Sequence, residues 1–185
     1  MKQCKLSLVL MAALAGGVGL GMTACSTAPK SAEDRSKLSS NTDDALAKFE
    51  SKDPEVRDAL NRAAGYAVLP NIGKGGLIVG GAYGHGEVFE HGHMIGYCDL
   101  TQGSVGFQAG GETISELIVF RDQEALDKFK SGQFQFAGNL SAVAIKPGVA
   151  NNAIYHEGVA VFTYTKTGLM ADASLAGQKI RFQPL

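Results

Sequence analysis

Three of the four histidines in the chain fall within nine positions, in the stretch GHGEVFEHGHMIGY over residues 84–97. Zinc takes three or four nitrogen or sulfur ligands at about 2.0–2.3 Å, so a histidine cluster of this kind could hold a metal ion. The same stretch has the pattern of a tight β-hairpin, because His91 and Gly92 suit a two-residue turn with positive φ. The hairpin predicts four cross-strand pairs: Glu90 with His93, Phe89 with Met94, Val88 with Ile95, and His85 with Cys98.

This register argues against a metal site. Side chains alternate between the two faces of a strand, so His85 and His93 point to opposite faces and His91 lies at the tip. The three imidazoles therefore cannot converge on one ion, and we expect neither a metal nor another cofactor. A slip of one residue would reverse this conclusion.

Other catalytic patterns are missing from the sequence. His156 and Glu157 lack the second histidine of an H-E-x-x-H motif, and the chain contains no G-x-S-x-G motif. The glycine-rich stretch over residues 73–86 fits neither of the common phosphate-binding loop patterns. Acidic residues such as Asp99, Glu112 and Glu116 could pair in space, but the sequence does not select a pair. We therefore expect a protein that is not an enzyme and has no catalytic residues.

The first 24 residues have the layout of a secretory signal peptide: Lys2 and Lys5, then an apolar stretch, then small residues. The run Met22-Thr23-Ala24-Cys25 resembles a bacterial lipobox, which implies that Cys25 becomes the acylated first residue of a mature lipoprotein. Ser26 follows that cysteine, and by analogy this favours attachment to the outer membrane, with palmitate among the acyl chains. The alternative is an ordinary secretory signal that is cleaved near Ala24.

Residues 25–40 are polar and contain no aromatic side chain, so we expect a flexible tether there and a single domain over residues 41–185. Without Lys2 and Lys5, the mature chain has 15 basic and 18 acidic residues, a formal charge of −3. This balance gives no reason to expect nucleic acid as a partner. Cys98 is then the single cysteine of the domain, so no internal disulfide can form, and its apolar context predicts a buried, inert thiol.

The domain has the pattern of an α+β fold. Helices are predicted at residues 42–50 and 53–65, where Asp53 can cap and Pro54 suits the first turn, and an inserted helix at 122–130. The segments between residues 66 and 184 are short, rich in Val, Ile, Phe and Tyr, and interrupted by turn residues. Glycines within strands indicate bulges, tight bends or close backbone approach. We therefore predict a strongly curved, barrel-like antiparallel sheet with two N-terminal helices and one inserted helix.

Long ordered motifs in this domain resemble the SYLF family, also called the Ysc84 actin-binding domain family. The resemblance covers about residues 42–184. It is carried by AAGYAVLPNIGKGGLIVGGAYG (63–84), SVGFQAGGE (104–112), ELIVF (116–120), LDKFKSG (126–132) and GVAVFTYTKTGLMADASLAGQK (158–179). It implies phospholipid binding: eukaryotic members bind phosphoinositides and some bind actin filaments, whereas bacterial members are commonly exported lipoproteins. Because no actin-contacting segment can be mapped here, we do not expect actin as a partner.

A headgroup-binding surface can be proposed on this basis. Lys74 lies in the glycine-flanked sequence Gly73-Lys74-Gly75-Gly76, where an ammonium and exposed N–H groups of a loop could receive a phosphate. Further candidates are Arg62, at a predicted helix end, and Lys166 and Lys179 in the last motif. The alternative is that Lys74 only solubilises a turn and that Arg62 interacts with the negative helix end. If they were exposed, Tyr83 and Phe134 could help the domain insert into the membrane interface, but we expect both rings to pack in the core.

The sequence therefore predicts an exported, lipid-anchored lipoprotein whose SYLF-like domain binds anionic phospholipid headgroups. Two alternatives remain open. The domain could be an envelope scaffold that binds a protein partner at an exposed strand edge, or the curved sheet could carry an apolar ligand in its interior.

Overall fold

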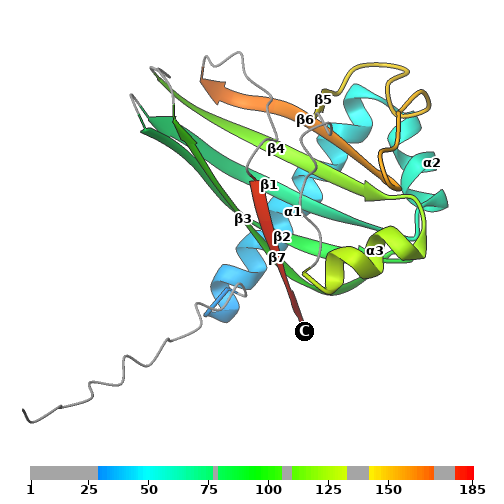
Figure 1. The fold of residues 1–185 in the computed structure, drawn as a ribbon, viewed down its shortest axis with the longest axis horizontal. Coiled ribbons are helices and arrows are strands. Elements are labelled where there is room, and N and C mark those ends of the chain that lie inside the picture. Colours follow the sequence, from blue (N-terminus) through cyan, green and yellow to red (C-terminus); the bar gives the residue numbers. More distant parts are fainter. Residues whose placement is uncertain (1–28, 77–78, 106–109, 133–141, 169–177) are drawn as a thin grey trace, which may run out of the picture.

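The computed structural model describes residues 29–76, 79–105, 110–132, 142–168 and 178–185 (Figure 1). Cys25 and the predicted signal peptide lie outside these ranges. Within them, no helix has both the length and the apolar composition that a membrane span requires. The helices are α1 (Ala32–Lys52), α2 (Glu55–Arg62) and α3 (Gln123–Lys130). The strands are β1 (Gly65–Gly76), β2 (Val79–Glu90), β3 (His93–Val105), β4 (Gly110–Phe120), β5 (Val143–Ala144), β6 (Val159–Gly168) and β7 (Gln178–Pro184).

The described strands form one sheet in the order β5-β6-β4-β1-β2-β3-β7. Every neighbouring pair is antiparallel except β5 and β6, which run parallel over two residues. This confirms the predicted α+β fold with a curved antiparallel sheet, two N-terminal helices and one inserted helix. The sheet does not close, however: β5 and β7 are its two edges, so the barrel-like description is corrected to an open, strongly curved sheet (Figure 1).

Each face of the sheet packs against different helices. The inner face packs on α3 and contains one apolar cluster, in which Leu126 and Phe129 of α3 contact strand residues such as Ile118 and Val88. The outer face packs on α1, α2 and the segment after β5, and contains a second cluster around Phe49. Two separate cores therefore hold the sheet from both sides.

Helix α1 begins ten residues before the predicted helix at 42–50. Its N-cap is Ser31, whose Oγ accepts a hydrogen bond from the Asp34 N–H at 3.0 Å. Acidic residues in the first turn favour the positive end of the helix dipole. Leu38 begins a buried stripe that continues through Thr42, Ala45 and Phe49. The tether predicted over residues 25–40 is therefore wrong from residue 32 onward, because those polar side chains form the exposed face of an amphipathic helix.

Asp53 joins α1, α2 and the segment after β5. Its carboxylate is buried, with Oδ1 accepting from the Glu55 N–H at 3.2 Å and Oδ2 accepting from the Ala150 N–H at 2.8 Å. Burial alone would raise the pKa of Asp53, but the hydrogen bonds from backbone N–H groups outweigh it and lower that pKa. The predicted capping role of Asp53 is confirmed in that its carboxylate accepts from the first N–H of α2, although Pro54 is the N-cap residue. Asp53 also anchors a segment 97 positions away.

The predicted hairpin is present, with His91 and Gly92 at φ values of 49° and 80°. Glu90 pairs with His93 and Phe89 with Met94, as expected, but the register then shifts and Val88 pairs with Gly96. Ile95 is thus the extra residue of a β-bulge, a feature that the alternating pattern did not indicate. The predicted pairs Val88–Ile95 and His85–Cys98 are corrected to Val88–Gly96 and His85–Asp99.

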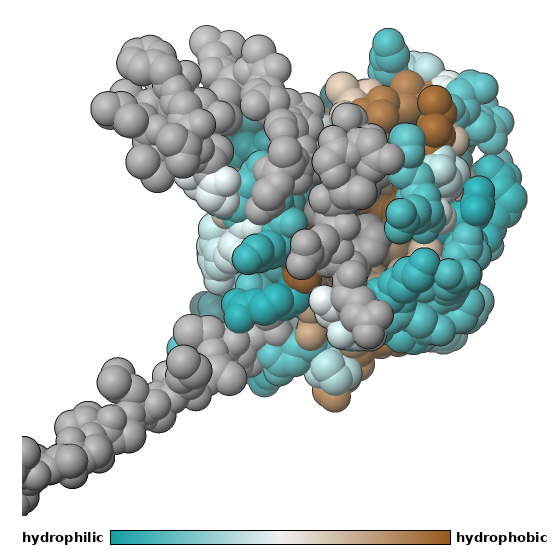
Figure 2. All heavy atoms as spheres, in the orientation of Figure 1, coloured by the Kyte–Doolittle hydropathy of each residue, from teal (hydrophilic) through white to brown (hydrophobic). Residues whose placement is uncertain are grey.

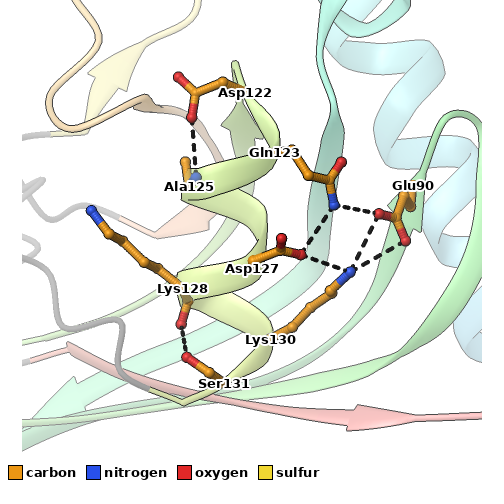
Figure 3. Close-up of polar contacts among 8 residues, drawn as sticks. All are labelled: Glu90, Asp122, Gln123, Ala125, Asp127, Lys128, Lys130 and Ser131. Carbon is orange, nitrogen blue, oxygen red and sulfur yellow. Dashed lines mark hydrogen bonds and ion pairs between the residues drawn. The ribbon is translucent and has the colours of Figure 1, made fainter.

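The turn end of this hairpin is tied to α3 by a polar network around Glu90 (Figure 3). Gln123 Nε2 donates to Glu90 Oε1 at 2.7 Å and to Asp127 Oδ1 at 3.0 Å. Lys130 Nζ lies 3.3 Å from Glu90 Oε1 and 3.1 Å from Asp127 Oδ1. The hydrogen bond from Gln123, followed by the contacts with Lys130, lowers the pKa of Glu90. This network fixes α3 over the inner face.

Glycines on the inner face mark positions where the backbones of neighbouring strands approach closely. A Cβ added to Gly86 would lie 2.3 Å from the Val68 carbonyl oxygen and 3.0 Å from Cys98 Sγ. A Cβ on Gly96 would lie 2.3 Å from the Gln183 carbonyl oxygen. By contrast, a Cβ on Gly103 would have no neighbour within 4 Å. The prediction that strand glycines permit close backbone approach is confirmed for the inner face.

Substituting Gly86 by Ala is expected to destabilise the protein by about 1–3 kcal/mol, because the added methyl group must displace a neighbouring strand. The matched change Gly103→Ala is expected to alter stability by less than about 0.5 kcal/mol. Urea denaturation of both variants checks this. Equal losses of stability would contradict the steric account of the curvature.

Candidate functional site

Lys74 lies on the inner face of β1 and not in a loop. It pairs with Glu112 of β4 on one side and with Ala82 of β2 on the other. Its exposed fraction is 9%. Gly73, Gly75 and Gly76 belong to the same strand, which pairs with β2 and β4 along this stretch. Because these backbone groups are part of a two-sided ladder, the expected phosphate-binding loop is corrected to the interior of a strand.

Around Lys74 the inner face contains several buried polar side chains, beside the apolar cluster that packs on α3. We define the inner polar cluster as Lys74, Glu112, Glu116 and Gln178, all of which are buried. Glu116 is fully buried, and its Oε2 accepts a hydrogen bond from Gln178 Nε2 at 3.4 Å. Three strands separate β4 from β7 in the sheet, so this contact is possible because the sheet curves back over itself.

The environment of Glu116 is unusual for a carboxylate. Burial raises the pKa of Glu116 to about 7, although the hydrogen bond from Gln178 and the charge of Lys74 lower it. Within the described residues, no ion pair of 4.0 Å or less joins Lys74 to either carboxyl of the cluster. Sequence reasoning named Glu116 only as one of several acids that could pair in space. The approach of β7 to β4, which brings Gln178 to Glu116, could not be read from the sequence.

The predicted residue Arg62 is not part of this cluster. It is exposed at the end of α2, where its Nη2 donates to Asn151 Oδ1 at 3.3 Å. Strand β1 begins at Gly65, and the nine steps from there to Lys74 span roughly 30 Å. Arg62 and Lys74 therefore lie near opposite ends of β1 and cannot contact one headgroup together.

Lys166 and Lys179 lie on the outer face, near the end of the sheet that carries Gly73 and Tyr83. Lys179 pairs with Thr101, and Thr101 pairs with Tyr83. Lys166 Nζ donates to Asn71 Oδ1 at 2.9 Å. Both lysines are exposed, and Tyr83 is 53% exposed between their strands, which corrects its expected place in the core. We define this outer patch as Tyr83, Lys166 and Lys179; it spans roughly 24 Å along the sheet.

A pocket of about 330 Å³ adjoins the outer patch. Tyr83 Oη and His85 Nε2 form a hydrogen bond at 2.7 Å, and His85 lines the pocket together with residues from the start of α1. The other lining residues are Pro29, Asp34, Lys37, Leu38, Asn41, Pro70 and Asn71. The described chain therefore starts, at Pro29, next to the outer patch. Phe134, the second aromatic candidate, lies outside the described residues.

The three clustered histidines do not converge. His93 pairs with Glu90, which contacts α3, whereas His85 lies on the opposite face against α1, and His91 is at the turn. Within the described part of the chain, no three His, Cys, Asp or Glu side chains are placed to hold a metal ion. Cys98 is free and buried, as predicted, and burial raises the pKa of its thiol. The bulge at Ile95 places this thiol in the inner apolar cluster instead of beside His85.

Protein purified without a histidine tag, incubated with zinc and then desalted, is expected to retain less than one zinc ion per chain. The histidines lie on different faces and supply too few convergent ligands for a stable site. Elemental analysis by mass spectrometry measures this. Stoichiometric zinc that is lost in both His85→Ala and His93→Ala variants would require a different hairpin register.

Comparison with known proteins supports the resemblance seen in the sequence. Residues 101–184 match the family Ysc84, described as "Las17-binding protein actin regulator". The chain is also 26% identical over 153 residues to the protein named "Beta cell expansion factor A" from Aeromonas veronii. That alignment covers 82% of this chain and 58% of the relative, so the chain spans less than two thirds of the relative's length. The family match runs from β3 to β7 and includes Glu116 and Gln178, as well as Lys166 and Lys179.

Proposed function

We propose that this domain binds the anionic headgroups of a phospholipid membrane and that an acylated Cys25 holds it at the bilayer. The match of residues 101–184 to the Ysc84 family supports the proposal. The observation that carries the proposal is the outer patch, which combines two exposed ammonium groups with an exposed aromatic ring. The domain would act through contact with lipid, without catalysis and without a cofactor.

The position of the anchor agrees with this choice of surface. Pro29 lies four positions after Cys25, so a fully extended chain spans at most about 14 Å between them. Pro29 lines the pocket that His85 and Asn71 share, next to Tyr83 and Lys166. Acyl chains on Cys25 would therefore bring the outer patch, and not the opposite end with Arg62, toward the bilayer. The outer membrane is the destination that this proposal assigns to the lipoprotein.

The strength of the headgroup contact follows from the number of charges. Each lysine near an anionic surface contributes about 1 kcal/mol, and this attraction is screened by salt. Lys74 is buried in the inner polar cluster, so the proposal assigns the contact to Lys166 and Lys179 and leaves Lys74 out of it. Two lysines give weak attraction, and stable attachment needs two or more acyl chains. The proposal does not extend to actin, which an exported domain would not meet.

Residues 26–185, purified without lipid, are expected to bind vesicles that contain anionic phospholipid, and the double change Lys166→Ala/Lys179→Ala should weaken binding roughly 10- to 30-fold at low salt. Flotation of vesicles with and without anionic lipid measures this. The control, Lys128→Ala/Lys146→Ala, removes the same charge from exposed positions elsewhere. Equal loss in the control, or no binding of the unchanged domain, would contradict the assigned surface.

The change Cys25→Ser in the full chain is expected to abolish acylation and to move the protein out of the membrane fraction. The measurement is intact mass of the protein together with fractionation of cells that produce it. An unmodified Cys25 thiol in the unchanged protein, with the protein free in solution, would contradict the anchor.

An apolar surface favours the scaffold as a second candidate function. Figure 2 shows hydrophobic residues gathered at the end of the molecule that carries β5. There, Ile154 is 77% exposed and Val143 is 45% exposed, and both line a cavity of about 570 Å³. Such a patch is typical of a protein-binding site. The carrier function has less support, because side chains of α3 fill much of the inner face.

A further inference from the structure

Each member of the Glu116–Gln178 pair has one buried oxygen without a hydrogen-bond partner among the described residues. Among the described residues, neither Glu116 Oε1 nor Gln178 Oε1 has a hydrogen-bond partner, although Glu116 Oε2 accepts from Gln178 Nε2. Two unpaired acceptors in a buried site are costly, and a buried carboxylate without a sufficient set of donors is costlier still. The pair therefore lacks one hydrogen-bond donor, and a hydrogen on the Glu116 carboxyl could supply it.

A single proton would satisfy both atoms. If Oε1 of Glu116 carries a hydrogen, it can donate to Oε1 of Gln178 while Oε2 still accepts from Nε2, which gives a cyclic acid–amide pair with two hydrogen bonds. We propose that Glu116 and Gln178 form a protonated latch that holds β7 against β4 across the inner face and that opens when Glu116 loses its proton. The latch does not depend on the proposed membrane function.

The groups around the latch determine what happens on ionisation. The ammonium of Lys74 on β1 and the thiol of Cys98 on β3 face the latch from neighbouring strands. Glu112 lies on β4, the strand that also carries Glu116. Once Glu116 is ionised, its carboxylate can no longer donate to Gln178, and the ammonium of Lys74 becomes its better partner. After ionisation, the Glu116 side chain would turn from Gln178 toward Lys74. Glu112 competes for the same ammonium, since it pairs with Lys74 across the strands.

Opening the latch affects β7 first. This strand pairs with β3 from Gln102↔Gln178 to Gly96↔Pro184 and is an edge of the described sheet. The Phe129–Phe182 contact, with ring centroids 6.0 Å apart, holds its other end on α3. Losing the Glu116 contact therefore frees the end of β7 at Gln178, while the end at Phe182 stays packed.

The direction of the pH dependence follows from Glu116. Folding raises the pKa of this carboxyl from 4.5 to about 7. The stabilisation that the latch gives is fully present below pH 4.5, decreases as the pH rises toward 7, and is lost above about pH 7. The β7 end at Gln178 is thus held at acidic pH and released at alkaline pH.

The test is hydrogen exchange of the β7 amides in the full mature protein at pH 5.5 and 8.5, corrected for the intrinsic rates. Protection near Lys179 and Ile180 should fall on the order of tenfold between the two pH values. In Glu116→Gln the protection should stay high at both, because an amide–amide pair keeps both hydrogen bonds without a titratable proton. The control Glu112→Gln should keep the pH dependence. A pH-dependent loss that persists in Glu116→Gln, or constant protection in the unchanged protein, would overturn the proposal.

A second measurement needs no variant of the latch residues. Infrared difference spectra of the unchanged protein between pH 5.5 and 8.5 should contain the carbonyl band of a protonated carboxyl that disappears at alkaline pH. Absence of this band at pH 5.5 would overturn the proposal even if Glu116→Gln failed to fold.

Discussion

The close approach of strand backbones on the inner face is the constraint from which the other features of this domain follow. At Gly86 and Gly96 a side chain would collide with the carbonyl oxygen of the adjacent strand, so the sheet can bend tightly at these positions. The bend brings β7 back toward β4, although β1, β2 and β3 separate them in the sheet. It also forms the hollow that α3 fills with Leu126 and Phe129. Without the bend, three intervening strands would keep the side chains of Glu116 and Gln178 too far apart to form a hydrogen bond.

The curvature gives the two faces different roles. The inner face is covered by α3 and contains a buried polar cluster, in which burial raises the pKa of the Glu116 carboxyl to about 7. The outer face is covered by α1 and α2 over part of its length, and beyond that cover it exposes Tyr83, Lys166 and Lys179. In our proposal the exposed end meets lipid, and the inner cluster regulates how firmly β7 is held. The two proposals use different residues and can fail independently.

The sequence was sufficient for local features that short-range rules govern. The hairpin turn at His91-Gly92, the cap at Asp53, helix α3 and the curved antiparallel sheet are all consequences of residue type and spacing. Two predictions from the sequence, the start of α1 and the strand register after the hairpin, were wrong for physical reasons. The polar composition of residues 32–40 concealed the start of α1, because its buried stripe becomes regular only from Leu38. The bulge at Ile95 shifted the register by one residue and moved Cys98 to the other face.

The candidate site was harder to predict, because long-range geometry forms it. The glycines around Lys74 suggested a phosphate loop, but they belong to a strand, since neighbours on both sides complete its ladder. Glu116 becomes distinct only when β7 brings Gln178 to it. Nuclear Overhauser contacts across the inner face test the central claim most directly. We predict contacts between the side-chain amide of Gln178 and the side chain of Glu116. If the Gln178 amide showed contacts with β3 residues and none with β4, the curvature described for this sheet would be contradicted.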